Sequence, residues 1–193
     1  VDVCEVIRAA STKPFGFMPF YPGPGLGGHC IPLDPHYLAW KMRTLHYNVK
    51  FIQTADEINS AMPAYVVDKI MHALNDERKA LNGAKILILG VAYKRDIDDV
   101  RESPALDVLH LLQQKGAIVA CHDPHIAEFH DHHGQLVKTI PYTDQALADA
   151  DCVVIITDHR AYDWAHVANH SRLIVDTRNA LHQLTGNARI IGL

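Results

Sequence analysis

Residues 86–120 read ILILGVAYKRDIDDVRESPALDVLHLLQQKGAIVA: an apolar run, a polar loop, an amphipathic stretch and a second apolar run. Ser103 and Pro104 supply a helix N-cap and a first helical residue, and Gly116 supplies a stop. Two apolar strands joined by a helix form a βαβ unit, which is right-handed in almost all proteins. The segment therefore predicts neighbouring strands of a parallel sheet.

Further apolar runs continue this alternation toward the C-terminus. CVVII at residues 152–156 and LIV at residues 173–175 have the length and composition of buried strands. Asn82 and Gly83 mark a break before the first strand. We therefore expect an α/β protein with a parallel-sheet domain over residues 83–193.

The region over residues 1–82 is predicted to be helical around one irregular loop. Thr54 and Glu57 have capping-box spacing, and apolar side chains follow at helical intervals to about residue 80. Pro63 can kink this long helix because proline lacks a backbone donor. Apolar side chains on more than one face indicate that the helix mediates a homodimer.

The composition is that of a globular protein and excludes some partners. Hydrophobic residues make up 48% of the 193 residues, and the formal net charge is -4, so no overall basic field favours nucleic acid or an anionic membrane. No apolar run approaches the ~20 residues that span a bilayer, and the start has no signal-peptide pattern. We expect a cytoplasmic protein, and the missing initiator Met indicates a piece of a longer one.

The loop over residues 13–35, KPFGFMPFYPGPGLGGHCIPLDP, is dense in Pro, Gly and aromatic residues, which prevents regular helix. Gly23, Gly25 and Gly28 spell G-x-G-x-x-G, but that fingerprint binds dinucleotides only between a strand and a helix of a βαβ unit. We interpret these glycines as positions where the backbone can approach a ligand closely.

Cys30 is the candidate nucleophile. It follows the glycines, lies beside His29 and precedes a predicted helix start in which Asp34 is the N-cap and Pro35 the first helical residue. These surroundings favour an exposed, reactive thiolate over a buried structural cysteine. The other three cysteines lie in apolar periodic segments, and we expect them in the core: Cys4, Cys121 and Cys152.

Three segments resemble one enzyme family. They are TKPFGFMPFYPGPGLGGHCIPLDPHYLAWK (residues 12–41), GVAYKRDIDDVRESPALDVL (90–109) and VDTRNAL (175–181), and they are similar to segments of the UDP-glucose and UDP-GlcNAc/ManNAc dehydrogenases. The resemblance implies a helical linker and dimerisation region at 1–82, followed by a Rossmann-like UDP-binding domain at 83–193. The family's N-terminal NAD-binding domain, with its catalytic Lys and Asn, has no counterpart in this sequence.

The same resemblance implies roles for individual residues. Cys30 would be the nucleophile, and Asp34 would activate water for thioester hydrolysis. Residues implied to contact the UDP-sugar are Tyr21, Gly25, Leu26, Gly27, Tyr93, Lys94 and Arg178. Arg101 would reach toward the NAD cofactor. For Lys94 the alternative is a solvated surface lysine, and for Arg101 it is an ion pair with Asp98 or Glu102.

One departure bears on the substrate. UDP-glucose enzymes carry a Lys just before the aspartate, where this sequence has Leu33. The CIPLDPHYLAWK form looks more like enzymes acting on N-acetylated sugars, with UDP-GlcNAc the first expectation. UDP-ManNAc, UDP-GalNAc and, less favoured by Leu33, UDP-glucose stay open as alternatives.

Two further hypotheses stay open. The chain could be a stand-alone UDP-sugar-binding module without catalysis. It could also bind a metal through the Cys and His residues crowded at positions 121–133, but their spacing matches no standard zinc motif, so we expect no metal site there.

Overall fold

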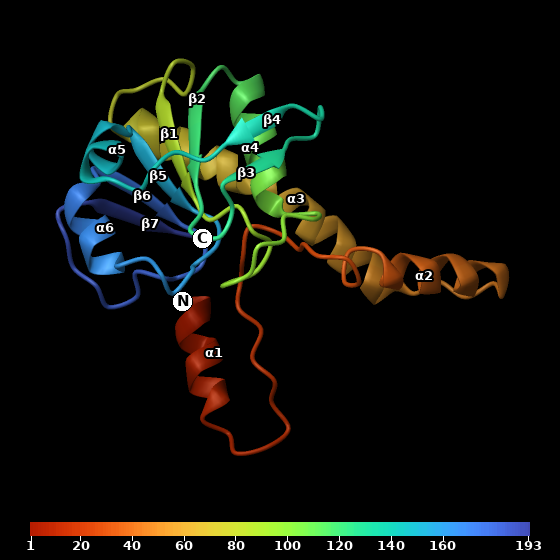
Figure 1. Cartoon of the computed structure of the whole chain (residues 1–193). Helices are drawn as coiled ribbons and strands as arrows, with labels where there is room; N and C mark the ends of the chain where they lie inside the picture. The colour runs from red at the N-terminus through yellow and green to blue at the C-terminus, as the bar shows by residue number, and fades with distance from the viewer.

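A five-stranded sheet with strand order β2-β1-β5-β6-β7 forms the second half of the chain (Figure 1). The structure is a computed structural model that describes all 193 residues. All neighbouring strands are parallel. The strands are β1 (Lys85–Leu89), β2 (Ile118–His122), β5 (Cys152–Ile155), β6 (Leu173–Asp176) and β7 (Arg189–Gly192). The four expected strands and the α/β class are confirmed, while β7 was not predicted.

Helices cover both faces of the sheet. Because successive side chains of a strand point to opposite faces, Ile86 and Ile88 pack in one buried cluster with α3 and α4, whereas Leu87 and Leu89 pack in another with α5 and α6. Each fully buried side chain of this size contributes about 1.5–3 kcal/mol to folding. The helices are α4 (Pro104–Gln114), α5 (Asp144–Asp149) and α6 (Trp164–His170), with the long α3 described below.

The cap of α4 is as predicted. The Ser103 hydroxyl accepts a hydrogen bond from the N–H of Ala105 at 3.3 Å, and Pro104 is the first helical residue. Gly116 follows the helix with φ +82°. A short antiparallel hairpin of β3 (Glu128–His130) and β4 (Leu136–Lys138) comes after β2 and was not predicted.

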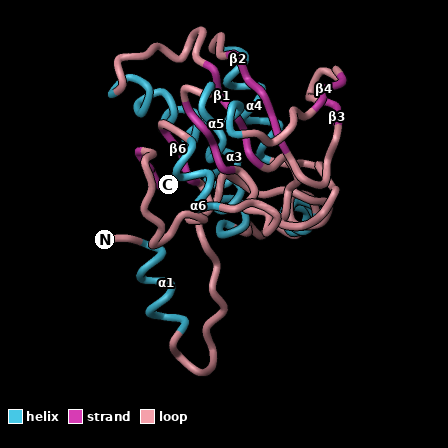
Figure 2. The backbone as a smooth tube through the Cα atoms, turned by 60° about the vertical axis from the view of Figure 1, so that its left-hand side comes forward, coloured by secondary structure: helices cyan, strands magenta, loops and turns pink.

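The N-terminal region holds α1 (Val3–Ser11), α2 (Asp34–Thr44) and α3 (Lys50–Asp76), with an irregular segment at residues 12–33. Helix α1 has no buried residue and projects away from the sheet domain, as both views show (Figures 1 and 2). Only the second part of α3 packs on the sheet. None of the helices combines the length and apolar composition needed to cross a lipid bilayer.

The start and end of α3 differ from the prediction. The helix begins at Lys50 rather than Thr54, ends at Asp76 rather than near residue 80, and continues through the buried Pro63. No capping box forms, because the carbonyl of Val49 already accepts the first helical amides after a tight turn from α2. A turn between two helices therefore sets the start, and local capping signals do not.

The cysteines separate into two environments. Cys121 and Cys152 are buried in the core as expected, and burial raises the pKa of each thiol to about 12. Cys4 does not lie in the core, which corrects the prediction. It is partly exposed on α1, a helix in which no residue is buried.

Candidate functional site

The loops that follow β1, β5 and β6 meet at one edge of the sheet. In open α/β sheets the edge at the C-terminal ends of the strands is where ligands bind. Tyr93 and Lys94 follow β1, and Arg178 follows β6. Strands β1 and β6 are both parallel to β5, which lies between them, so three of the expected UDP-sugar contacts lie at the same edge.

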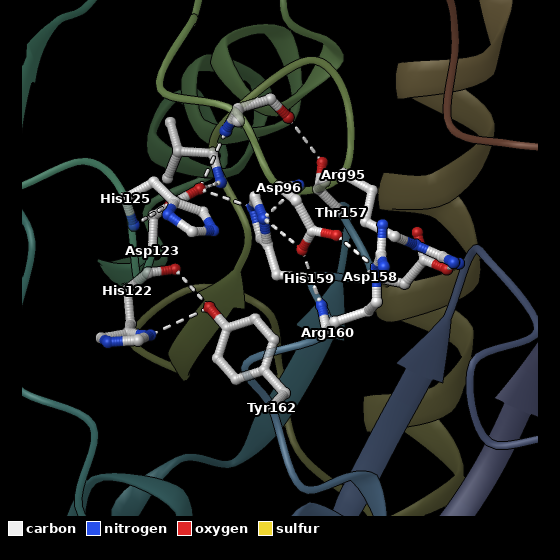
Figure 3. A network of polar contacts seen from close by, with 12 residues as sticks. Arg95, Asp96, His122, Asp123, His125, Thr157, Asp158, His159, Arg160 and Tyr162 are labelled. Atoms are coloured by element: carbon white, nitrogen blue, oxygen red, sulfur yellow. Dashed lines mark hydrogen bonds and ion pairs between the residues drawn. The ribbon is translucent and has the colours of Figure 1, made fainter.

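Asp123 is the buried centre of this edge (Figure 3). Its carboxylate accepts hydrogen bonds from the backbone N–H groups of Val91 and Ala92, at 2.7 and 3.0 Å, and from that of His125 at 2.9 Å. His159 Nε2 donates a fourth bond at 3.0 Å. Burial by itself raises the pKa of Asp123, but these donors outweigh it and lower the pKa to about 2. The ionised carboxylate thus holds the backbone that follows β1.

His159 connects this centre to the loop after β5. Its Nδ1 accepts the N–H of Asp96 at 2.9 Å, so the ring carries its proton on Nε2, toward Asp123. Asp96 in turn accepts hydrogen bonds from the backbone and the side chain of Arg160, at 2.9 and 2.6 Å. These contacts tie the two loops together at the edge of the sheet.

Arg178 is a half-buried cation at this edge. Its Nε donates to the carbonyl oxygen of Ile156 at 2.7 Å, and its guanidinium forms no ion pair. Burial, followed by the positive charge of Arg95, lowers the pKa of Arg178. A desolvated guanidinium without an anionic partner is a suitable binding point for a phosphate group. Lys94, in the loop after β1, is exposed and likewise forms no ion pair.

The glycine-rich loop lies directly on the loop after β1. The N–H of Gly28 donates to the carbonyl oxygen of Arg101 at 2.9 Å. A Cβ on Gly27 would lie 2.6 Å from the Cβ of Tyr93 and 2.7 Å from the carbonyl oxygen of Glu102. Gly28 has φ +93° and lies against the ring of Tyr93. Both positions need glycine, so part of the G-x-G-x-x-G pattern serves loop docking in a segment that opens no helix.

Cys30 lies just beyond these glycines and is exposed, with its Sγ 3.9 Å from Nδ1 of His29. Asp34 does not cap α2, which corrects the prediction: Leu33 takes the N-cap position and no side chain caps the helix. The reason is that Leu33 already has helical angles, and the carbonyl of Cys30 accepts the N–H groups of Leu33 and Asp34 at 3.1 and 2.8 Å. The Asp34 carboxylate is left exposed.

Arg101 has a different partner from the two that the sequence suggested. Its guanidinium donates hydrogen bonds to both carboxylate oxygens of Asp99, with distances of 2.6 to 3.0 Å. It pairs with neither Asp98 nor Glu102. The backbone N–H of Arg101 also donates to Asp99 at 2.9 Å, so the local turn folds the side chain onto this carboxylate.

A large groove lies outside this edge of the sheet. A groove of about 870 Å³ runs between the glycine-rich loop and α2, α3 and α4. Gly25 and Leu26 line it, whereas Cys30 and Arg178 do not, and Tyr21 is exposed outside it. We place the candidate site at the strand ends because the unpaired cations and Cys30 belong to that edge or to the loop docked on it.

The Cys and His residues of segment 121–133 do not converge. Cys121 is in the core, His122 contacts Tyr162, and His132 contacts Asp107. Asp123 and His159, by contrast, organise the site and were not predicted as site residues. The only sequence signal for Asp123 was its place directly after a predicted strand.

Known proteins related to this chain match both its N-terminal region and its sheet domain. The UDP-binding domain of the UDP-glucose/GDP-mannose dehydrogenase family matches residues 87–183, and the central domain of that family matches residues 1–61. A UDP-N-acetyl-D-mannosamine dehydrogenase from Methanococcus maripaludis is 33% identical over 189 residues, which is 94% of this chain and 41% of the relative. The Escherichia coli K12 enzyme of that name is 33% identical over 92% of this chain and 43% of its own length.

A solved structure agrees in fold over the whole chain. The UDP-D-ManNAc dehydrogenase from Pyrococcus horikoshii matches with a TM-score of 0.83 and 29% identity, over 100% of this chain and 44% of that one. The chain thus spans less than half the length of the relatives that it matches.

The ionised Asp123 makes stability depend on pH. Its pKa is about 2 in the folded chain and about 3.9 when unfolded, so about 2–3 kcal/mol of stability is present above pH 4 and is lost as the pH falls toward 2. Asp123→Asn should lower the free energy of unfolding at pH 7 by a similar amount and flatten its change between pH 4 and 2. Urea denaturation across this pH range measures both, with exposed Asp68→Asn as control. A variant as stable as wild type at pH 7 would contradict the assignment.

The docking of the glycine-rich loop can be tested at Gly27. Gly27→Ala should lift the loop from Tyr93 and Glu102, because the new Cβ overlaps backbone atoms that cannot move aside. We expect hydrogen exchange in residues 23–30 to accelerate at least about tenfold, as expected for loss of a hydrogen-bonded contact. Gly192→Ala, whose Cβ meets nothing within 4 Å, is the control. Unchanged exchange would show that the contact does not hold the loop.

Proposed function

This chain belongs to the UDP-glucose/GDP-mannose dehydrogenase family, and from this premise we propose that it is the C-terminal part of an NAD-dependent UDP-sugar 6-dehydrogenase with Cys30 as nucleophile. One observation carries the proposal. The loop that ends in Cys30 is docked, through Gly27 and Gly28, on the same sheet edge that presents the unpaired Arg178. The Cys30 thiol, which can form a covalent bond, and the Arg178 guanidinium, which can bind an anion, are therefore proposed to contact the same ligand.

The edge of the sheet suits a UDP group. The half-buried guanidinium of Arg178 and the exposed ammonium of Lys94 supply positive charge for a diphosphate. Both sides of this edge meet the glycine-rich loop, since Arg178 lies against Gly23 and Tyr93 lies against Gly27 and Gly28. The Asp123 carboxylate faces the backbone and not this surface, so it does not cancel that charge. We propose that Tyr21, Gly25, Leu26 and Gly27 complete the sugar side of the pocket.

The part proposed for Cys30 is to hold the reacting carbon. Its thiolate adds to the C6 aldehyde and keeps it in place as a thiohemiacetal, whereas a free aldehyde would hydrate and leave. After the second oxidation the carbon is a thioester of Cys30. Asp34, whose carboxylate is exposed and caps no helix, accepts a proton from the water that hydrolyses this thioester and releases the thiolate.

The residues present do not form a dinucleotide pocket. The G-x-G-x-x-G segment packs on Tyr93 and opens no helix, which does not fit a binding loop for pyrophosphate. NAD would be held by the remainder of the full-length enzyme and would supply the hydride acceptor for the two oxidations. We propose that Arg101 lies toward it, and that this chain alone binds UDP-sugar without turning it over.

The sugar is proposed to be a UDP-N-acetylhexosamine. Leu33 replaces the Lys of UDP-glucose enzymes, and the relatives described above are UDP-N-acetylmannosamine dehydrogenases. UDP-ManNAc therefore fits as well as the UDP-GlcNAc expected from the sequence.

The exposed part of α3 is proposed as a homodimer surface. Phe51 is 94% exposed and Ile58 59% exposed on this helix, and Trp40 is 65% exposed on the neighbouring α2. Large apolar side chains gathered on two adjacent helices are typical of protein interfaces. The support is this exposure together with the length of α3, which is 27 residues.

Binding of UDP by the 193-residue chain tests the domain assignment. Calorimetry should detect weak binding of UDP and of UDP-GlcNAc, and Arg178→Ala should weaken it about tenfold or more, since a charge-assisted hydrogen bond contributes about 1.5–3 kcal/mol. Lys94→Ala should act in the same direction, and Lys115→Ala, on an exposed turn after α4, should have no effect. Tighter binding of NAD than of UDP would refute the assignment.

The nucleophile is tested in the full-length enzyme. Cys30→Ala should reduce uronic acid formation by about 10³-fold or more, because no covalent intermediate can form. Cys30→Ser should accumulate a sugar ester that intact-mass spectrometry detects, since an alkoxide leaves poorly. Asp34→Asn should slow hydrolysis more than hydride transfer, measured as NADH formed per product, and Cys4→Ser is the control. Near wild-type uronic acid formation by Cys30→Ala would eliminate the mechanism.

A further inference from the structure

Asp144, His166 and His170 converge on the face of the sheet that α5 and α6 cover. One ligand atom of each residue lies within 4.8 Å of those of the other two. The two histidines are four residues apart on α6, so their side chains share one side of the helix, and their rings stack with centroids 3.9 Å apart. Asp144 is the first residue of α5, and it approaches from a separate element.

The hydrogen bonds of His170 leave a lone pair directed at this cluster. Nδ1 of His170 lies 2.9 Å from the carbonyl oxygen of His166, and a carbonyl can only accept, so the proton of the neutral ring is on Nδ1. Nε2 of His170 therefore carries a lone pair, and it faces Oδ2 of Asp144 at 3.8 Å. Two electron-rich atoms that face each other are stabilised by a cation between them.

The backbone contact of His170 is also the arrangement found in metal sites. A histidine that binds a metal through one ring nitrogen usually donates the N–H of the other to a carbonyl or carboxylate, which fixes the tautomer. Nε2 of His166 donates to Oδ1 of Asp144 at 2.8 Å. A metal ion can replace this proton, which then moves to Nδ1 of the same neutral ring.

Tyr142 is a second, independent sign of a polar ligand near this cluster. Its hydroxyl is buried and has no hydrogen-bond partner, which is rare in folded proteins. Its ring centroid lies 6.3 Å from that of His166. The ring that carries this unpaired hydroxyl therefore lies beside the cluster.

We propose that Asp144, His166 and His170 bind a divalent transition-metal ion, with Zn²⁺ as the probe, through one carboxylate oxygen and two Nε2 atoms. Three protein ligands of this kind, with water in the fourth position, match the composition of open tetrahedral zinc sites. The bound ion would join α5 to α6. The site is independent of the proposed dehydrogenase activity, and it lies outside the histidine-rich segment at residues 121–133.

A second cluster of the same size does not meet the same conditions. Asp96, His125 and His159 also place ligand atoms within 4.8 Å of one another. Both ring nitrogens of His159 are used, however: Nδ1 accepts the N–H of Asp96, and Nε2 donates to Asp123 in the core. Metal binding there would require breaking the network that holds the loop after β1.

Titration of the tag-free chain with ZnCl₂ tests the proposal. Calorimetry should show one saturable site, weakened about 100-fold in His170→Ala and about tenfold in Asp144→Asn, which keeps one oxygen ligand without its charge. His125→Ala, in the competing cluster, is the matched control and should bind as wild type does. Binding unchanged in His170→Ala, or lost in His125→Ala, would overturn the assignment.

Two further readouts exclude a merely structural effect of the substitutions. Thermal melting should show a higher Tm with zinc in wild type, reversed by EDTA, and no zinc-dependent rise in His170→Ala. Co²⁺ in place of zinc should give the visible absorption of a tetrahedral site in wild type and in His125→Ala only. Because Asp144 is exposed, Asp144→Asn should fold normally, and circular dichroism checks this. Equal zinc-induced shifts in wild type and Asp144→Asn would also contradict the proposal.

Discussion

The contact between the glycine-rich loop and the loop after β1 is the constraint on which the arrangement of this chain depends. It is made by backbone atoms: the N–H of Gly28 donates to the carbonyl of Arg101, and Gly27 leaves no room for a Cβ against Tyr93 and Glu102. A backbone contact of this closeness determines where the chain runs more strictly than a side-chain contact does. It places the segment ending in Cys30 on the sheet edge, although neither partner belongs to a helix or strand.

A buried carboxylate makes this docking surface rigid. Asp123 remains ionised inside the protein because three backbone N–H groups and His159 donate to it, and removal of any one of them would leave a buried charge less well compensated. The negative charge is directed inward. The cations of the edge, Lys94 and Arg178, therefore remain free of ion pairs and available to an anionic ligand.

Surroundings, and not residue type, separate the cysteines and the histidines of the chain. Cys121 and Cys152 are desolvated, which keeps their thiols protonated, whereas Cys30 is exposed at the end of a loop. Among the histidines, His159 has both ring nitrogens occupied by protein groups, while His170 keeps a lone pair directed at a carboxylate. The same side chain thus serves as a structural link in one place and as a candidate metal ligand in another.

The sequence by itself determined the elements that depend on short-range patterns. These are the four strands that coincide with apolar runs, the α4 helix with its Ser103 cap, and the irregular loop around Cys30. Its motifs also identified the family. Only the tertiary structure decided which residues meet, such as Asp123 with His159 and Asp144 with His170. The physical reason is that capping and periodicity act over a few residues, whereas these pairings join side chains that the chain path brings together from 26 or more positions apart.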